Sequence, residues 1–108
     1  MRWTIETLNA EVDAELDALP ADMLARFTRI AQLIESVGLT HIGMPHVRPL
    51  ESGLWEMRMT GRDGIARAIY VTRTGRRVIV VRAFVKKTQT TPRREIEIAL
   101  KRAKEIMP

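Results

Sequence analysis

The sequence predicts an α+β domain. An N-terminal strand and a two-helix hairpin are expected to pack on a twisted, mainly antiparallel sheet of about four strands, followed by a C-terminal helix. Apolar residues recur at helical spacing in the first 40 residues, whereas short β-rich runs separated by glycine-containing turns follow them. A chain of 108 residues fits one domain, so we expect residues 1–108 to form a single unit.

The first 40 residues predict one strand and two helices. Residues 2–7, RWTIET, alternate apolar and polar side chains as a short strand does. Apolar residues at helical spacing then follow Asn9, which suits an N-cap, until Pro20 interrupts them. A second helix begins at Pro20 and ends before Gly38, a C-cap candidate. The two helices should form a hairpin that is mostly acidic outside.

The rest of the chain predicts an antiparallel meander and a final helix. Residues 39–47 contain glycine and proline and have no sustained period, so we expect a loop. Four β-rich runs follow, with hairpin-like separators: VRPLE (47–51), LWEMRM (54–59), IARAIYV (65–71) and RVIVVRAFV (77–85). Thr91 is expected to cap the last helix and Pro92 to open it.

Charge is divided unevenly along the chain. Residues 1–40 hold three basic and seven acidic side chains, whereas residues 41–108 hold fifteen basic and six acidic ones. A basic body of this kind attracts polyanions, most simply nucleic acid. A solvated basic surface with no ligand explains the charge equally well.

Composition also limits the compartment and the chemistry. The sequence has no cysteine, which excludes disulfides, thiolate nucleophiles and Cys-ligated metals and fits a reducing compartment. Two histidines are too few for a His-rich metal site, and we expect no metal or other cofactor. No window approaches the roughly 18 apolar residues that a membrane span needs, so we expect a cytoplasmic protein without a membrane partner.

The predicted hairpin at residues 74–75 brings two arginines together. With a two-residue loop there, Arg67 lies opposite Arg82. Like charges directly across a sheet are unfavourable by up to about 1 kcal/mol, and a phosphate held between the two guanidinium groups would offset that cost. Alternatively, the register differs, or each arginine reaches water or a carboxylate such as Glu56.

The connector FVKKTQTTP, residues 84–92, places more cations at the end of the strand that carries Arg82. Lys86 and Lys87 should emerge beside the arginine pair, just before a helix N-terminus whose amides favour anions. Thr88 and the polar residues after it offer uncharged contacts to phosphate or ribose oxygens. Together these residues predict a site for a phosphate backbone.

Several neighbouring residues have two interpretations. Trp55 is either core or a platform on which a base stacks, and Tyr70 is either core or a stacking residue; the core is favoured for both. His46 either transfers a proton or is a surface residue. Arg58 and Glu56 share a polar face and either continue the patch around the arginines or form a surface ion pair of little energetic weight.

Three ordered motifs resemble one protein family. They are GLWEMR (53–58), ARAIY (66–70) and FVKKTQTTP (84–92), followed by REIEIALKRAKE (94–105). This set resembles the RelE/HigB superfamily of bacterial toxins, specifically its phage-related HigB-like branch, over nearly the whole chain. The resemblance implies a RelE-like fold and the toxin of a type II toxin–antitoxin pair. Such a toxin cuts messenger RNA, usually on the translating ribosome, and is neutralised by a small cognate antitoxin, often a helix-turn-helix DNA-binding protein.

The resemblance also implies roles for individual residues. Arg67 matches the strand arginine expected at the scissile phosphate, Arg58 the arginine that ends the first motif, and Lys86 and Lys87 the paired lysines. Arg82 departs from the family pattern, in which a histidine or a small polar residue is more usual. The catalytic candidates are Arg67, Arg82, Lys86 and Lys87, and the RNA-binding candidates are His46, Arg48, Arg58 and Thr88.

The chemistry that fits these residues is attack of an RNA 2′-hydroxyl on the adjacent phosphorus. It needs no metal because the nucleophile belongs to the substrate. Arginines would stabilise the charge that develops on the phosphorane oxygens, and Lys86 or Lys87 would act as general base or acid. The alternative is a non-catalytic basic module that binds nucleic acid, or a degenerate toxin that binds only its antitoxin.

Overall fold

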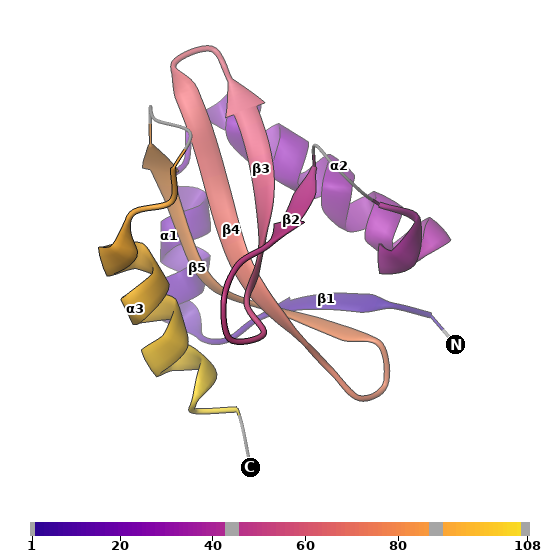
Figure 1. The fold of residues 1–108 in the computed structure, drawn as a ribbon. Coiled ribbons are helices and arrows are strands. Elements are labelled where there is room, and N and C mark those ends of the chain that lie inside the picture. Colours follow the sequence, from indigo (N-terminus) through magenta and orange to yellow (C-terminus); the bar gives the residue numbers. More distant parts are fainter. Residues whose placement is uncertain (1, 43–45, 87–89, 107–108) are drawn as a thin grey trace.

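The computed structural model describes residues 2–42, 46–86 and 90–106 of the chain (Figure 1). Along the chain the elements are β1 (Thr4–Thr7), α1 (Ala10–Asp17), α2 (Ala21–Val37), a short 3₁₀ helix η1 (Leu39–His41), β2 (Val47–Pro49), β3 (Trp55–Gly61), β4 (Gly64–Arg73), β5 (Arg77–Lys86) and α3 (Arg93–Ala103). The predicted order of one strand, two helices, a β-meander and a final helix is confirmed.

The five strands form one mixed sheet in the order β1-β5-β4-β3-β2. Strands β2, β3, β4 and β5 pair with one another in antiparallel fashion. Strand β1 pairs in parallel with the first part of β5. The sequence predicted about four strands. The structure has one more because the N-terminal strand β1 joins the edge of the meander beside β5.

Helices cover both faces of this sheet (Figure 1). Helices α1 and α2 pack on one face and α3 on the other. Successive residues of β4 alternate between the two cores, with Ala68 and Tyr70 in the core under α1 and α2, and Ile69 and Val71 in the core under α3. A strand buried on both faces is hydrophobic at almost every position, so the exceptional polar residue Arg67 stands out.

The helix ends follow the expected local chemistry. The side chain of Asn9 accepts a hydrogen bond from Val12 N–H at 3.1 Å and caps α1 as predicted. Helix α2 ends at Gly38, whose φ of 91° lies in the region that favours glycine. In the described parts of the chain, no helix has the length and apolar character required to cross a membrane.

The predicted register between β4 and β5 is wrong. Arg73 pairs with Arg77, so the hairpin loop has three residues rather than two, and its last residue, Arg76, has a φ of 59°. A second irregularity shifts the register between Ile69 and Tyr70. The two changes together move β5 by two residues relative to β4 at the far end of the hairpin.

Candidate functional site

Four cationic residues from four strands share the α3 face of the sheet: Arg48 of β2, Arg58 of β3, Arg67 of β4 and Lys86 of β5. We call these four residues the cation cluster. Arg58 pairs directly with Arg67 across β3 and β4, and Arg48 pairs with Glu56. Lys86 pairs with Ile65, which places it diagonal to Arg67, where Cβ atoms lie about 7–8 Å apart. The register therefore converts four separate positions into one surface.

Glu56 lies at the centre of the cation cluster and is fully buried (0% exposed). Its Oε1 atom accepts a hydrogen bond from Arg58 Nε at 3.0 Å, and its Oε2 atom lies 4.0 Å from Arg67 Nε. The Thr91 hydroxyl donates to Oε2 at 2.5 Å. A carboxylate buried among cations and a hydroxyl has its charge compensated, which is the condition for keeping an ion in a core.

Thr91 differs from its predicted role. The N-cap of α3 is Pro92, and no side chain forms a capping hydrogen bond there. The Thr91 hydroxyl is instead directed to Glu56 in β3. The segment before α3 is thereby tied to the cation cluster.

Arg67 is the largest of the fully buried side chains (0% exposed). Burial lowers the pKa of its guanidinium; Glu56 opposes this shift, while the charges of Arg58 and Arg48 add to it. An arginine surrounded in this way is poorly solvated and has cations for neighbours. An anion bound nearby would therefore gain more from Arg67 than from a solvated arginine.

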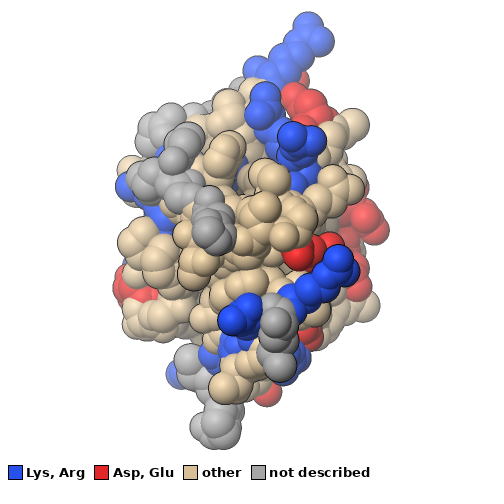
Figure 2. Space-filling model, turned by 90° about the vertical axis from the view of Figure 1, so that its right-hand side faces the viewer, with Lys and Arg blue, Asp and Glu red and all other residues tan. Residues whose placement is uncertain are grey.

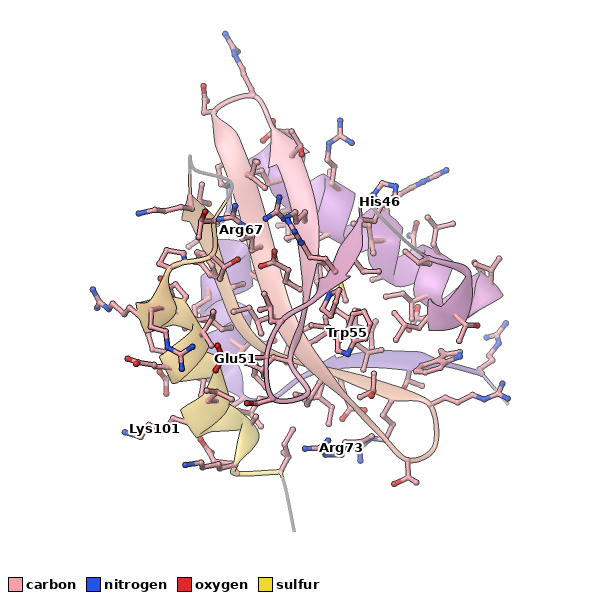
Figure 3. The ribbon with its side chains drawn as sticks, in the orientation of Figure 1. His46, Glu51, Trp55, Arg67, Arg73 and Lys101 are labelled. Carbon is pink, nitrogen blue, oxygen red and sulfur yellow. The ribbon has the colours of Figure 1, made fainter. Side chains whose placement is uncertain are left out.

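His46 begins the segment that leads into β2, and its carbonyl accepts a hydrogen bond from Arg58 N–H at 2.8 Å. Its side chain is exposed. In Figure 3, His46 and Arg67 both lie in the upper half of the sheet, whereas Arg73 lies at the far lower end of β4. The backbone contact keeps His46 next to the cation cluster.

Arg82 does not lie directly opposite Arg67 as the sequence predicted; it is diagonal to Arg67, as Lys86 is, but carboxylates hold its guanidinium. It pairs with Ile69, while Phe84 stands opposite Arg67. The Nε atom of Arg82 donates to Glu95 at 2.6 Å and its Nη1 atom donates to Glu15 at 2.7 Å. The hydrogen bond that Arg82 donates to Glu95 raises the pKa of Arg82 in spite of its partial burial.

Glu15 connects three elements at this second location. Besides Arg82, it accepts hydrogen bonds from Arg102 of α3, at 2.8 and 2.9 Å, and from Ala83 N–H of β5, at 3.1 Å. Burial raises the pKa of Glu15. The hydrogen bonds from Arg102 and Ala83 and the nearby positive charges lower it by a larger amount, so the net shift of the pKa is downward. The surroundings of Arg82 are thus those of an internal ion-pair network that joins α1, β5 and α3.

The other candidates have varied outcomes. Lys86 ends β5 with an exposed side chain, whereas Lys87 and Thr88 lie outside the described residues. Tyr70 is 1% exposed, which confirms its core assignment. Trp55 was also expected in the core, but it is 38% exposed, because it sits at the start of β3 near the edge of the sheet, opposite Pro49 of the short strand β2.

Sequence analysis missed the central position of Glu56. The alternation of LWEMRM places Glu56 and Arg58 on one face, which is correct, but a surface ion pair was one of the two expected outcomes. The signal that could have found it is positional. A carboxylate on an inner strand that has an arginine two residues away and faces another arginine, here Arg48 on β2, is a candidate for a buried ion pair.

The α+β architecture of this chain is that of a RelE-like fold. A crystal structure described as the archaeal RelE-RelB complex from Pyrococcus horikoshii OT3 contains a chain with the same fold, with a TM-score of 0.56 and 18% sequence identity. The match covers 83% of this chain and 100% of that chain. At this identity the likeness establishes the shared fold.

The family is identified by a match between its sequence model and this chain. The chain belongs to the family described as Phage derived protein Gp49-like (DUF891), whose model matches residues 14–104. No curated protein matches the chain. The RelE-like fold expected from the ordered motifs is confirmed, and the family agrees with the phage-related branch that they resemble.

Proposed function

We propose that the protein is the toxin of a type II toxin–antitoxin system and that it cleaves messenger RNA by a metal-independent reaction. The observation that supports this proposal best is the cation cluster, in which Arg48, Arg58, Arg67 and Lys86 share one face around a single buried carboxylate. Cations outnumber carboxylates among the described residues of this cluster four to one. Such an arrangement suits a phosphodiester, whose oxygens accept hydrogen bonds from guanidinium groups.

The reaction is an intramolecular displacement within the RNA. The 2′-oxygen forms a bond to the adjacent phosphorus, the bond from phosphorus to the 5′-oxygen breaks, and the products are a 2′,3′-cyclic phosphate and a free 5′-hydroxyl. A general base removes the proton of the 2′-hydroxyl, and a general acid supplies one to the departing 5′-oxygen. Arg58, whose side chain is partly exposed, stabilises the charge on the phosphorane oxygens directly, and the buried Arg67 adds its positive charge from within the sheet.

Lys86 and His46 are the candidates for proton transfer among the described residues. Both have exposed side chains. They lie on opposite sides of the pair formed by Arg58 and Arg67, with Lys86 on β5 and His46 just before β2. Lys87 and Thr88, which follow Lys86 directly, stay in the proposal as a second basic residue and an RNA contact. Arg48 binds the RNA backbone next to the scissile phosphate.

Glu56 acts as a positioning residue rather than as the base. Both of its oxygens already accept hydrogen bonds, from Arg58 and from Thr91, and its side chain is closed off from solvent. Its charge keeps the two arginines close to each other in spite of their mutual repulsion. Arg82 has a structural role in our proposal, because its guanidinium is held by Glu15 and Glu95.

The cellular setting follows from the same proposal. The substrate is messenger RNA on the translating ribosome, in the cytoplasm, where the ribosome positions the strand and compensates for weak proton transfer. The archaeal structural relative was crystallised as a complex of RelE with RelB. We propose by analogy that a small cognate antitoxin, of the helix-turn-helix DNA-binding class, neutralises this protein.

Cleavage of a defined message on purified ribosomes tests the proposal. The wild-type protein is expected to produce cleaved fragments that end in a 2′,3′-cyclic phosphate, and Lys86→Gln to slow cleavage by about 100-fold. Lys86 has an exposed side chain, so this variant should fold. Arg94→Gln removes a charge from the exposed side of α3 and serves as the matched control, with cleavage unchanged.

The departure of Arg82 from the family pattern favours a second candidate, a degenerate toxin that binds RNA or its antitoxin without cleavage. Ribosomes that bind the wild-type protein but keep the message intact would support this candidate. Growth arrest on induction, relieved by a neighbouring gene for a small DNA-binding protein, separates the two in cells. A catalytically inactive protein gives neither the arrest nor its relief.

A further inference from the structure

A cleft of about 460 Å³ lies away from the cation cluster, where the start of β1, the end of α2 and the β4–β5 hairpin meet. Its lining includes Arg2, Trp3, Glu35, Ser36, Thr40 and Arg76. The volume falls within the range of roughly 300–1,000 Å³ that is typical of small-molecule sites. Six residues of β4 separate Arg67 from the hairpin, and at about 3.4 Å per residue this is roughly 20 Å. The cleft is therefore separate from the proposed cleavage site.

Strand pairing brings the two arginines of the cleft together. Thr4 N–H donates to the carbonyl of Arg76 at 3.0 Å, so Arg2, two residues before Thr4, lies next to the hairpin. The N-terminal end of β1 and the β4–β5 hairpin occupy the same side of the molecule in Figure 1. Figure 2 faces that side and shows basic side chains (blue) in its upper part and again just below its middle, with acidic side chains (red) among them and an uncharged area (tan) at its centre.

Arg76 has an unusual backbone. Its φ of 59° is in the left-handed region, which costs a residue with a Cβ about 1–2 kcal/mol and which glycine or asparagine adopts more readily. This is the usual conformation of the last residue in a three-residue hairpin loop, and it fixes the backbone from which the Arg76 side chain lines the cleft.

The lining matches the parts of a nucleotide. Trp3 packs one side against the core under α1 and α2 while it lines the cleft, which gives a base a flat surface to stack on. The guanidinium groups of Arg2 and Arg76 match a phosphate, and the hydroxyls of Ser36 and Thr40 suit ribose. Glu35 adds one negative charge, which directs the phosphate toward the two arginines.

We propose that this cleft binds a ribonucleotide, with the base against Trp3 and the phosphate between Arg2 and Arg76. The nucleotide comes either from an RNA chain or from the free pool. Cleavage at the cation cluster is not required for this binding, so the two proposals can fail independently.

Calorimetry with adenosine 5′-monophosphate tests the proposal. The wild-type protein should bind this nucleotide at least tenfold more tightly than inorganic phosphate or adenosine alone. The double variant Arg2→Gln/Arg76→Asn should lose at least tenfold in affinity, and Trp3→Leu at least fivefold. Asparagine tolerates the left-handed backbone at residue 76, and Arg2 is exposed, so the double variant should fold. Arg29→Gln, an exposed charge change on α2, should stay within twofold of the wild type.

Nuclear magnetic resonance of the wild-type protein locates the ligand without any variant. The Trp3 indole N–H and the amides of Ser36 and Thr40 should shift on titration with the nucleotide. Absence of binding at millimolar nucleotide, shifts centred on Arg58 and Arg67, or an equal loss in Arg29→Gln would each overturn the proposal. A five-nucleotide RNA distinguishes the sources: tighter binding than the mononucleotide, weakened by Trp3→Leu, identifies RNA, and binding of the mononucleotide alone identifies the free pool.

Discussion

The substitution Glu56→Gln tests whether one buried carboxylate holds the cation cluster together. Glutamine keeps the shape of the side chain and one oxygen acceptor, which can serve Arg58 or Thr91 but not both, and it removes the negative charge. Arg67 is 0% exposed and lies 4.0 Å from this carboxylate. Breaking a buried ion pair by removing one partner costs about 3–5 kcal/mol, because the other charge stays in the core. Whole domains are stable by about 5–15 kcal/mol, so the loss would be a large share of the total.

Urea denaturation measures this loss, with Glu51→Gln as the matched control. Glu51 pairs with Arg93 on the surface, where removal of one partner costs about 0–1 kcal/mol. The midpoint should fall much further for Glu56→Gln than for Glu51→Gln, with the same dependence on urea concentration. Equal shifts in the two variants would refute the central role that we give to Glu56. The double variant Glu56→Met/Arg67→Met should recover much of the stability, because a buried pair can be replaced by apolar residues at little cost.

Three further predictions concern the framework around the site. The pKa of Glu15 is lowered in the folded protein, so its stabilising contribution is present above its ordinary value of 4.5 and is lost as the pH falls below it; acid denaturation should therefore be less steep in Glu15→Gln. Thr91→Val should cost about 1–2 kcal/mol in thermal or urea unfolding, since it removes the hydrogen bond to the buried carboxylate of Glu56. Gly61→Ala should cost about 1–3 kcal/mol in the same assay, because a Cβ there would lie 2.6 Å from Met23 Cγ in α2; full stability would show that α2 can move away.

Local patterns predicted the elements of this fold because each depends on a few adjacent residues. The alternation of apolar and polar side chains located the strands, and Asn9 and Gly38 located two helix ends. The register of β4 and β5 could not be read in the same way. It depends on a third loop residue, Arg76, in a conformation that sequence does not suggest for arginine, and on an irregularity at residues 69–70.

The candidate site was predicted in part for the same reason. Arg58 and Arg67 belong to neighbouring strands whose register followed from a short hairpin, so their common face was accessible to sequence reasoning. The position of Arg82 depended on the shifted pair of strands and was wrong. The surroundings of Glu56 include the hydroxyl of Thr91, 35 residues further along the chain, which no local pattern encodes.

The contact between Glu15 and Ala83 N–H has a consequence for association between molecules. Strand β1 pairs with residues 77–80 of β5, so within the described parts of the chain no strand lies on the outer side of the later part of β5. An exposed rim of this kind tends to recruit strands from other chains. Here α1 lies along that rim and its carboxylate occupies one of the amide donors, with Arg82 and Arg102 holding the carboxylate in place. The covering helix and the occupied donor should therefore discourage copies of this chain from joining edge to edge.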